Sequence, residues 1–141
     1  MVNSEKMIEF ASKQKVAFIA SIDEEGFPNM KAMLAPRQVD CNVFYFTTNT
    51  SSMRVAQYIK NEKACIYFYN KGTIKYEGVM FKGIMEVLTD REIKNEIWRT
   101  GDRIFYSKGV TDPDYCVLKF TAQSGKHYCD LKTESFDIIG K

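Results

Sequence analysis

Residues 43–59 read VFYFTTNTSSMRVAQYI, and this stretch decides the fold. Val43–Thr48 is an apolar, aromatic-rich run that predicts a strand. Asn49–Ser52 is a polar turn, and the apolar members of Met53–Ile59 recur at helical spacing. A helix that starts directly after a strand leaves unpaired N–H groups beside Ser and Thr hydroxyls and Arg54, which favours a phosphate. The alternative is a capped surface helix with a solvated arginine, which is the commoner use of such residues.

Upstream of this stretch the sequence predicts one helix and one hairpin. Asn3 or Ser4 can cap a short amphipathic helix, which we expect to lie across an open end of the fold. Val16–Ile22 and Asn29–Ala35 are strand-like and flank a strong turn signal, so they should form a hairpin. Pro36–Asn42 is polar and is expected to close a reversal.

Downstream, two further strands and a helix are expected. Ala64–Tyr69 is apolar on both faces, as in a strand that is buried on both sides or enters an interface. Ile74–Leu88 is long for one strand, and Gly78 and Gly83 should mark bulges or bends. Thr89–Glu92 fits a capping box that opens a helix.

The C-terminal part predicts more antiparallel strands. Tyr115–Gln123 and His127–Leu131 are expected to form a hairpin around Ser124–Lys126, followed by a tail strand at Phe136–Ile139. In total, six or seven strands with mostly hairpin connections and three short helices predict a mainly β fold. We expect a small antiparallel barrel with helices over its ends, in a single domain over residues 1–141.

Charge and hydropathy narrow the function classes. The chain has 141 residues and a formal net charge of +2, with Lys and Arg spread among Asp and Glu, so nucleic acid is not the obvious partner. No apolar run approaches the length of a membrane span, and the amphipathic N-terminal stretch does not read as a signal peptide. We therefore expect a cytoplasmic protein without a membrane partner.

The cysteines and the single histidine argue against a metal site. Cys41, Cys65, Cys116 and Cys129 are far apart and form no CxxC pair, and His127 is the only histidine. A zinc site needs a cluster of such ligands, so no metal is expected. Small core cysteines in a reducing compartment are the default interpretation.

With its elements in this order, the chain resembles the FMN-binding split β-barrels of the pyridoxamine 5'-phosphate oxidase-like family, in particular the general stress protein branch. The resemblance extends from the strand at Val16 to Leu131. It rests on the order and spacing of several short pieces. These pieces are Lys31–Leu34, Tyr45–Arg54, the strand end Gly83-x-x-Glu86-Val87, Trp98 and Gly109–Tyr115.

The resemblance implies a six- to seven-stranded, Greek-key-like split barrel that forms a homodimer, with FMN in each of two grooves between the subunits. By motif, Lys31 and Arg54 would meet the FMN phosphate, with Met53 beside them and a hydroxyl from Ser52. Charge-assisted hydrogen bonds suit a phosphate dianion.

Further motif positions would hold the rest of the flavin. Met33 and Leu34 would run along the flavin edge, and Thr47 and Thr48 would touch the ribityl chain or the ring. Apolar walls with a few polar groups suit such a ring. Trp98 would approach the flavin from the partner subunit or simply anchor its own helix.

Structural interpretations of these residues stay open. Lys31 can be an outward-pointing strand residue, and Met33 and Leu34 can be barrel core. Phe105–Tyr106 is a further candidate for the ring wall. His127 lacks an evident carboxylate or nucleophile partner in the sequence and reads as structural.

Departures from the pattern limit the function. The C-terminal Arg/His motif of true pyridoxamine phosphate oxidases is missing, Pro36 replaces a second basic residue beside Arg37, and a glutamine that meets the flavin falls near Gly78. We therefore expect a flavin-dependent oxidoreductase whose electron donor or acceptor is an unknown small molecule, with no catalytic residue assigned. The alternatives are a non-enzymatic flavin-binding stress-response protein, or a split barrel that holds a deazaflavin or haem, with His127 as the axial ligand.

A homodimer also has a motive that is independent of the resemblance. Ala64–Tyr69, with Tyr76, Val79 and Phe81, supplies more aromatic surface than the inside of one small barrel can take. The excess predicts a partner surface.

Overall fold

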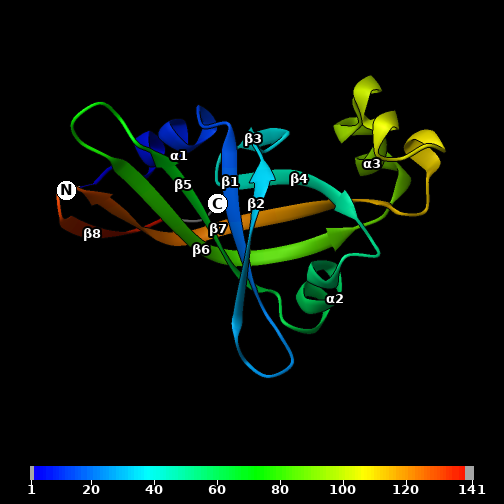
Figure 1. Cartoon of the computed structure of the whole chain (residues 1–141), viewed down its shortest axis with the longest axis horizontal. Helices are drawn as coiled ribbons and strands as arrows, with labels where there is room; N and C mark the ends of the chain where they lie inside the picture. The colour runs from blue at the N-terminus through cyan, green and yellow to red at the C-terminus, as the bar shows by residue number, and fades with distance from the viewer. Residues whose placement is uncertain (1, 139–141) are drawn as a thin grey trace.

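The computed structural model describes residues 2–138, in which eight antiparallel strands form one strongly curled sheet (Figure 1). The strands are β1 (Val16–Ile22), β2 (Pro28–Leu34), β3 (Gln38–Asp40), β4 (Val43–Asn49), β5 (Lys63–Asn70), β6 (Glu77–Leu88), β7 (Tyr115–Cys129) and β8 (Lys132–Asp137). The helices are α1 (Ser4–Ser12), α2 (Met53–Lys60) and α3 (Arg91–Ile97), with 3₁₀ turns η1 (Thr100–Ile104) and η2 (Gly109–Thr111).

The strand order is β2-β1-β5-β6-β7-β4-β3, and β8 also pairs with β7. β6 and β7 are the longest strands and form the middle of this path, and β2 lies at one edge. The predicted mainly β fold with three short helices is confirmed. The count of six or seven strands is one or two too low.

The core lies inside the curl of the sheet, with Phe44 at its centre. The Phe44 ring centroid lies 5.7 Å from that of Phe68, 5.3 Å from Phe81 and 6.2 Å from Phe120. These rings come from β4, β5, β6 and β7, and all four side chains are fully buried. Since strands distant in sequence supply the cluster, burial of these rings closes the sheet around one core.

Side-chain caps define where α1 and α3 begin. Asn3 caps α1 by accepting a hydrogen bond from the Glu5 N–H at 2.8 Å, as one of the two predicted caps. α3 begins one residue later than the predicted capping box, because Asp90 is the N-cap and accepts from the Ile93 N–H at 3.3 Å. The longest α-helix in residues 2–138 has nine residues, and none there is long and apolar enough to cross a membrane.

The predicted break at Ser124–Lys126 is wrong. β7 runs through it without interruption from Tyr115 to Cys129. Gly125 is needed there for close packing: a β-carbon would lie 2.4 Å from the Met80 carbonyl oxygen and 2.5 Å from the Phe136 ring. The glycine therefore marks a crowded strand and not a turn.

The chain reverses instead at Asp130 and Leu131, whose φ angles are 52° and 66°. Residues other than glycine rarely adopt this left-handed conformation, so the sequence gives little signal for the turn. β8 consequently begins at Lys132, earlier than the predicted tail strand at Phe136–Ile139. Ile139 lies outside the described residues.

Two other strand boundaries differ from prediction. β6 begins at Glu77 and not at Ile74, whose side chain is 92% exposed in the preceding loop. The pairing register of β6 and β7 shifts at Gly83, which confirms one of the two predicted bulges. Gly78 pairs in regular register, so there is no bulge at this position.

A short strand lies where only a polar reversal was predicted. β3 pairs with the first part of β4, with Val39 opposite Phe44. β5 was expected to be apolar on both faces and either buried on both sides or part of an interface. Its Ala64, Ile66 and Phe68 side chains are buried, whereas Cys65 and Tyr67 on the opposite face are only half-buried in the single chain.

Candidate functional site

A cleft of about 250 Å³ lies where β2, β4, α2 and the segment after η1 meet. One wall is Lys31–Ala35 at the end of β2, and the opposite wall is Phe46–Asn49 at the end of β4. Arg37, Arg54 and the Phe105–Tyr106 pair complete the lining. The cleft thus combines three cationic side chains with apolar and hydroxyl surface.

Arg54 is the most informative residue of the cleft. It stands in the first turn of α2, and its Nη2 donates a hydrogen bond to the Thr48 hydroxyl at 3.0 Å. Its Nε, however, is buried and has no hydrogen-bond partner. Among residues 2–138 it is the one buried side-chain nitrogen or oxygen without a partner. A buried donor without a partner costs about 1–3 kcal/mol. The unpaired Nε therefore points to a hydrogen-bond acceptor that the single chain does not supply.

The turn before α2 is fixed by hydrogen bonds to Asp114, which is distant in the sequence. The Asp114 carboxylate accepts hydrogen bonds from the Ser51 N–H at 2.9 Å and from the Thr50 hydroxyl at 2.9 Å. These hydrogen bonds lower the pKa of Asp114, so the carboxylate stays ionised. Asp114 belongs to the Gly109–Tyr115 motif, but its role in fixing this turn was not predicted.

Two predicted ligand residues of this helix stand outside the cleft lining. The Ser52 hydroxyl accepts a hydrogen bond from the Val55 N–H at 3.4 Å and acts as the N-cap of α2. The Met53 side chain is 77% exposed. Neither lines the cleft, although both lie within two residues of Arg54 in the sequence.

The predicted residues of β2 and β4 do meet in the cleft. Lys31 and Leu34 are exposed and Met33 is half-buried on β2, whereas Thr47 is half-buried and Thr48 is buried on β4. All five line the cleft. The structure therefore brings together Lys31, Met33, Leu34, Thr47 and Thr48 with Arg54.

Trp98 belongs to a second, smaller hydrophobic cluster and does not line the cleft. Its ring lies edge-on to Tyr115 at a centroid distance of 5.1 Å and 6.3 Å from Tyr106. Within one chain it anchors the segment that carries Tyr106. Burial raises the pKa of Tyr106 to about 12, so its hydroxyl is neutral near pH 7.

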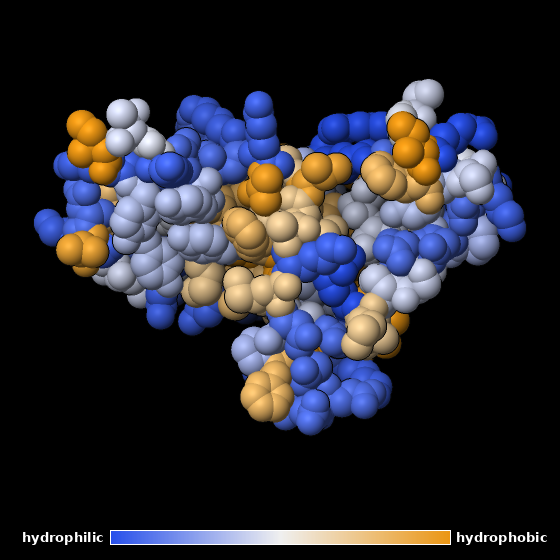
Figure 2. All heavy atoms as spheres, in the orientation of Figure 1, coloured by the Kyte–Doolittle hydropathy of each residue, from blue (hydrophilic) through white to orange (hydrophobic). Residues whose placement is uncertain are grey.

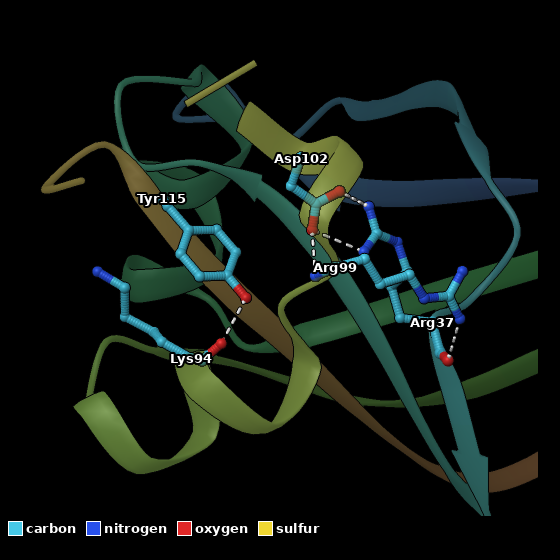
Figure 3. A network of polar contacts seen from close by, with 5 residues as sticks. All are labelled: Arg37, Lys94, Arg99, Asp102 and Tyr115. Atoms are coloured by element: carbon cyan, nitrogen blue, oxygen red, sulfur yellow. Dashed lines mark hydrogen bonds and ion pairs between the residues drawn. The ribbon is translucent and has the colours of Figure 1, made fainter. Parts of the chain in front are cut away.

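Arg37, adjacent to Pro36, is a cleft residue whose partner the sequence did not reveal. Its guanidinium forms a two-point ion pair with Asp102 of η1, and Nη1 donates to Oδ2 at 2.8 Å (Figure 3). Burial raises the pKa of Asp102, but the hydrogen bonds and charge of Arg37 and the Arg99 N–H lower it by more. The net pKa is therefore below the usual value.

The histidine lies away from the cleft. His127 is on β7, opposite Val79 of β6, and its Nε2 lies 2.8 Å from a carboxylate oxygen of Glu77. It does not line the cleft that holds Arg54.

The outer face of the sheet carries a second, apolar hollow of about 380 Å³. Its lining includes Met30, Tyr67, Tyr76, Met80 and Tyr128. Figure 2 shows apolar side chains gathered over the middle of the face on which β1 and β2 are drawn in Figure 1. The face also includes Met30 and Leu34 of β2, each 70% exposed in the single chain.

A family model described as pyridoxamine 5'-phosphate oxidase matches residues 4–129. The chain belongs to the pyridoxamine 5'-phosphate oxidase family. Within this family, a solved structure of a protein related to general stress protein 26 from Clostridium acetobutylicum is 36% identical, with a TM-score of 0.80. The match covers 96% of this chain and 92% of that one. This agrees with the predicted general stress protein branch.

Two further matches are with proteins longer than this chain. A pyridoxine/pyridoxamine 5'-phosphate oxidase of Rhizobium leguminosarum bv. trifolii (strain WSM2304) is 32% identical over 74 residues, which are 52% of this chain and 34% of the relative. The match thus spans about a third of that oxidase. A haem-binding protein from Mycobacterium smegmatis has a TM-score of 0.75 at 12% identity, covering 97% of this chain and 60% of that one, and shows the shared fold alone.

Proposed function

We propose that this member of the pyridoxamine 5'-phosphate oxidase family binds FMN, with the phosphate beside Arg54 and Lys31. The observation that carries the proposal is the buried, unpaired Nε of Arg54 in a cleft that also contains Lys31. A phosphate dianion supplies acceptor oxygens and two negative charges. Thr48, whose hydroxyl already contacts Arg54, holds the guanidinium in place.

The rest of the cleft suits the remainder of a flavin mononucleotide. Met33 and Leu34 offer apolar surface, and Thr47 offers a hydroxyl on the opposite wall. Ligand sites usually measure about 300–1,000 Å³, so a cleft of about 250 Å³ in one chain covers only part of such a ligand. A second surface is needed to complete the site.

We infer that a second copy of the chain supplies this surface in a homodimer. β2 pairs only with β1 and is exposed along nearly its whole length, with Met30 and Leu34 each 70% exposed. The apolar outer hollow, with Tyr67 and Tyr76, adjoins the same strand through Met30. Contiguous apolar surface of this kind is typical of subunit interfaces.

The proposed reaction class is electron or hydride transfer with a small molecule. Bound FMN supplies this chemistry at its ring, and the protein supplies binding, orientation and exclusion of water. The ionisable residues of the cleft are Lys31, Arg37, Arg54 and the neutral Tyr106, so no carboxylate or histidine stands ready as an acid or base. The chemistry of such a site would reside in the bound flavin, and the lining contains no acid or base that would identify the substrate.

Two measurements separate the proposal from its alternatives. The absorption spectrum of the purified protein distinguishes flavin from haem, and His127, at a distance from the cleft residues and paired with Glu77, favours flavin. Turnover of NAD(P)H with an artificial electron acceptor then distinguishes an oxidoreductase from a non-enzymatic flavin-binding protein. Flavin bound without turnover across a panel of donors and acceptors would favour the non-enzymatic function.

A further inference from the structure

Two segments far apart in sequence are tied together at the rim of the cleft. Arg37, between β2 and β3, is 65 residues from Asp102 of η1, and both terminal nitrogens of its guanidinium, Nη1 and Nη2, donate to the Asp102 carboxylate. In return, the Arg99 guanidinium donates to the Arg37 carbonyl oxygen at 3.0 Å. Figure 3 shows Asp102 between the Arg99 N–H and the Arg37 side chain.

The pair is shielded from solvent. The Arg37 side chain is 13% exposed and the Asp102 side chain 5% exposed. Asp102 also accepts a hydrogen bond from the Arg99 N–H at 2.9 Å, so both carboxylate oxygens have partners. A two-point arginine–carboxylate pair fixes orientation as well as distance, and a lysine cannot reproduce it.

The same aspartate starts the turn that forms one wall of the cleft. Its backbone carbonyl accepts hydrogen bonds from the Phe105 N–H at 2.9 Å and from the Tyr106 N–H at 3.0 Å. Phe105 and Tyr106 both line the cleft, but Asp102 does not. Phe105 is 68% exposed, so the segment holds a large aromatic ring at the rim of the cleft.

We propose that the Arg37–Asp102 pair is a latch that positions Phe105 and Tyr106 as a wall of the ligand cleft. Arg37 then acts through this wall and is not a phosphate ligand. Its charge is matched by Asp102, which leaves Lys31 and Arg54 as the cleft cations that face a ligand. The inference rests on the proposed function, because it takes the ligand to be a flavin.

The test compares FMN with riboflavin, which has the same ring and no phosphate. In Asp102→Asn and in Arg37→Lys, the latch account expects both affinities to fall by the same factor, of the order of tenfold for one charge-assisted pair. Arg37→Lys keeps a cation beside the carboxylate, so it serves if Asp102→Asn does not fold. Glu24→Gln, which breaks the exposed pair with Lys60, is the matched control and should change neither affinity.

Two results would overturn the latch. A rise in FMN affinity in Asp102→Asn, with riboflavin unchanged, would show that the freed Arg37 is a phosphate ligand. Unchanged affinity for both flavins in both variants would show that the pair does not position the wall.

A measurement without ligand keeps the latch separate from the proposed function. Hydrogen exchange at the Phe105 and Tyr106 amides, and trypsin cleavage after the exposed Arg103, should accelerate in both latch variants and not in Glu24→Gln. If they accelerate while the wild-type chain binds no flavin, the proposed function fails and the latch stands. Unchanged exchange and cleavage would refute the latch whatever the flavin result.

Discussion

Replacing Arg54 with methionine should separate ligand binding from folding. The change keeps most of the apolar stem and removes the guanidinium. In the free chain it deletes one hydrogen bond to Thr48 and also the buried Nε that has no partner. The guanidinium donor is charged, so the first loss lowers the free energy of unfolding by about 1.5–3 kcal/mol, and the second removes a penalty of about 1–3 kcal/mol. The two effects nearly cancel, so the ligand-free variant should have about the stability of the wild type.

FMN binding, in contrast, should weaken. A hydrogen bond to a charged group contributes about 1.5–3 kcal/mol, which corresponds to an increase in Kd of about 10- to 150-fold. Riboflavin lacks the phosphate, so its affinity should stay within about twofold of the wild-type value. The expected signature of Arg54→Met is a large FMN effect, a small riboflavin effect and little change in stability.

The assay is a fluorescence titration of each flavin, with urea unfolding of the ligand-free protein. Lys60→Met, at the exposed end of the same helix, is the matched control and should leave both affinities unchanged. Equal losses for FMN and riboflavin would refute the phosphate assignment. Unchanged FMN affinity would show that Arg54 does not bind the phosphate and has a structural role alone.

Three further predictions concern the fold, the turn before α2 and the dimer. Gly83→Ala should lower the free energy of unfolding by about 1–3 kcal/mol in urea titrations, because its β-carbon would lie 2.0 Å from the Thr121 carbonyl oxygen, whereas Gly101→Ala, with open space, should not. The pKa of Asp114 is lowered by folding, so its carboxylate stabilises the fold above pH 3.8 and loses this effect as the pH falls through the folded-state pKa. The stability difference between wild type and Asp114→Asn should be constant near pH 7 and vanish in acid; a difference that persists at pH 2 would contradict this. Met30→Asp should give a folded monomer by light scattering with weakened FMN binding, and an intact dimer would count against the proposed interface.

Runs of apolar residues and helical spacing correctly predicted several strands and helices. Val16–Ile22 matches β1, and the predicted strand and helix of residues 43–59 match β4 and α2 to within one residue. The prediction failed where a residue served tertiary packing. Gly125 looks like a turn residue but lies in a strand beside Phe136, and the real turn at Asp130 and Leu131 carries no glycine.

The candidate site was predictable only in part for the same reason. Lys31 and Arg54 come from separate motifs, and the family order of those motifs was enough to expect them in one site. Ser52 was expected to contribute a hydroxyl to the phosphate site, but its hydroxyl caps α2, a role that serine also favours. The Arg37–Asp102 pair joins residues 65 positions apart, and a contact over this distance cannot be predicted from local periodicity or spacing.

The most direct test of the central claim is a titration of the purified protein with FMN, following the visible spectrum, the bound stoichiometry and the mass by light scattering. The account predicts one FMN per chain in a dimer, with the flavin spectrum altered on binding. A protein that takes up no FMN at concentrations well above micromolar would contradict it, and the cleft residues would then have structural roles alone.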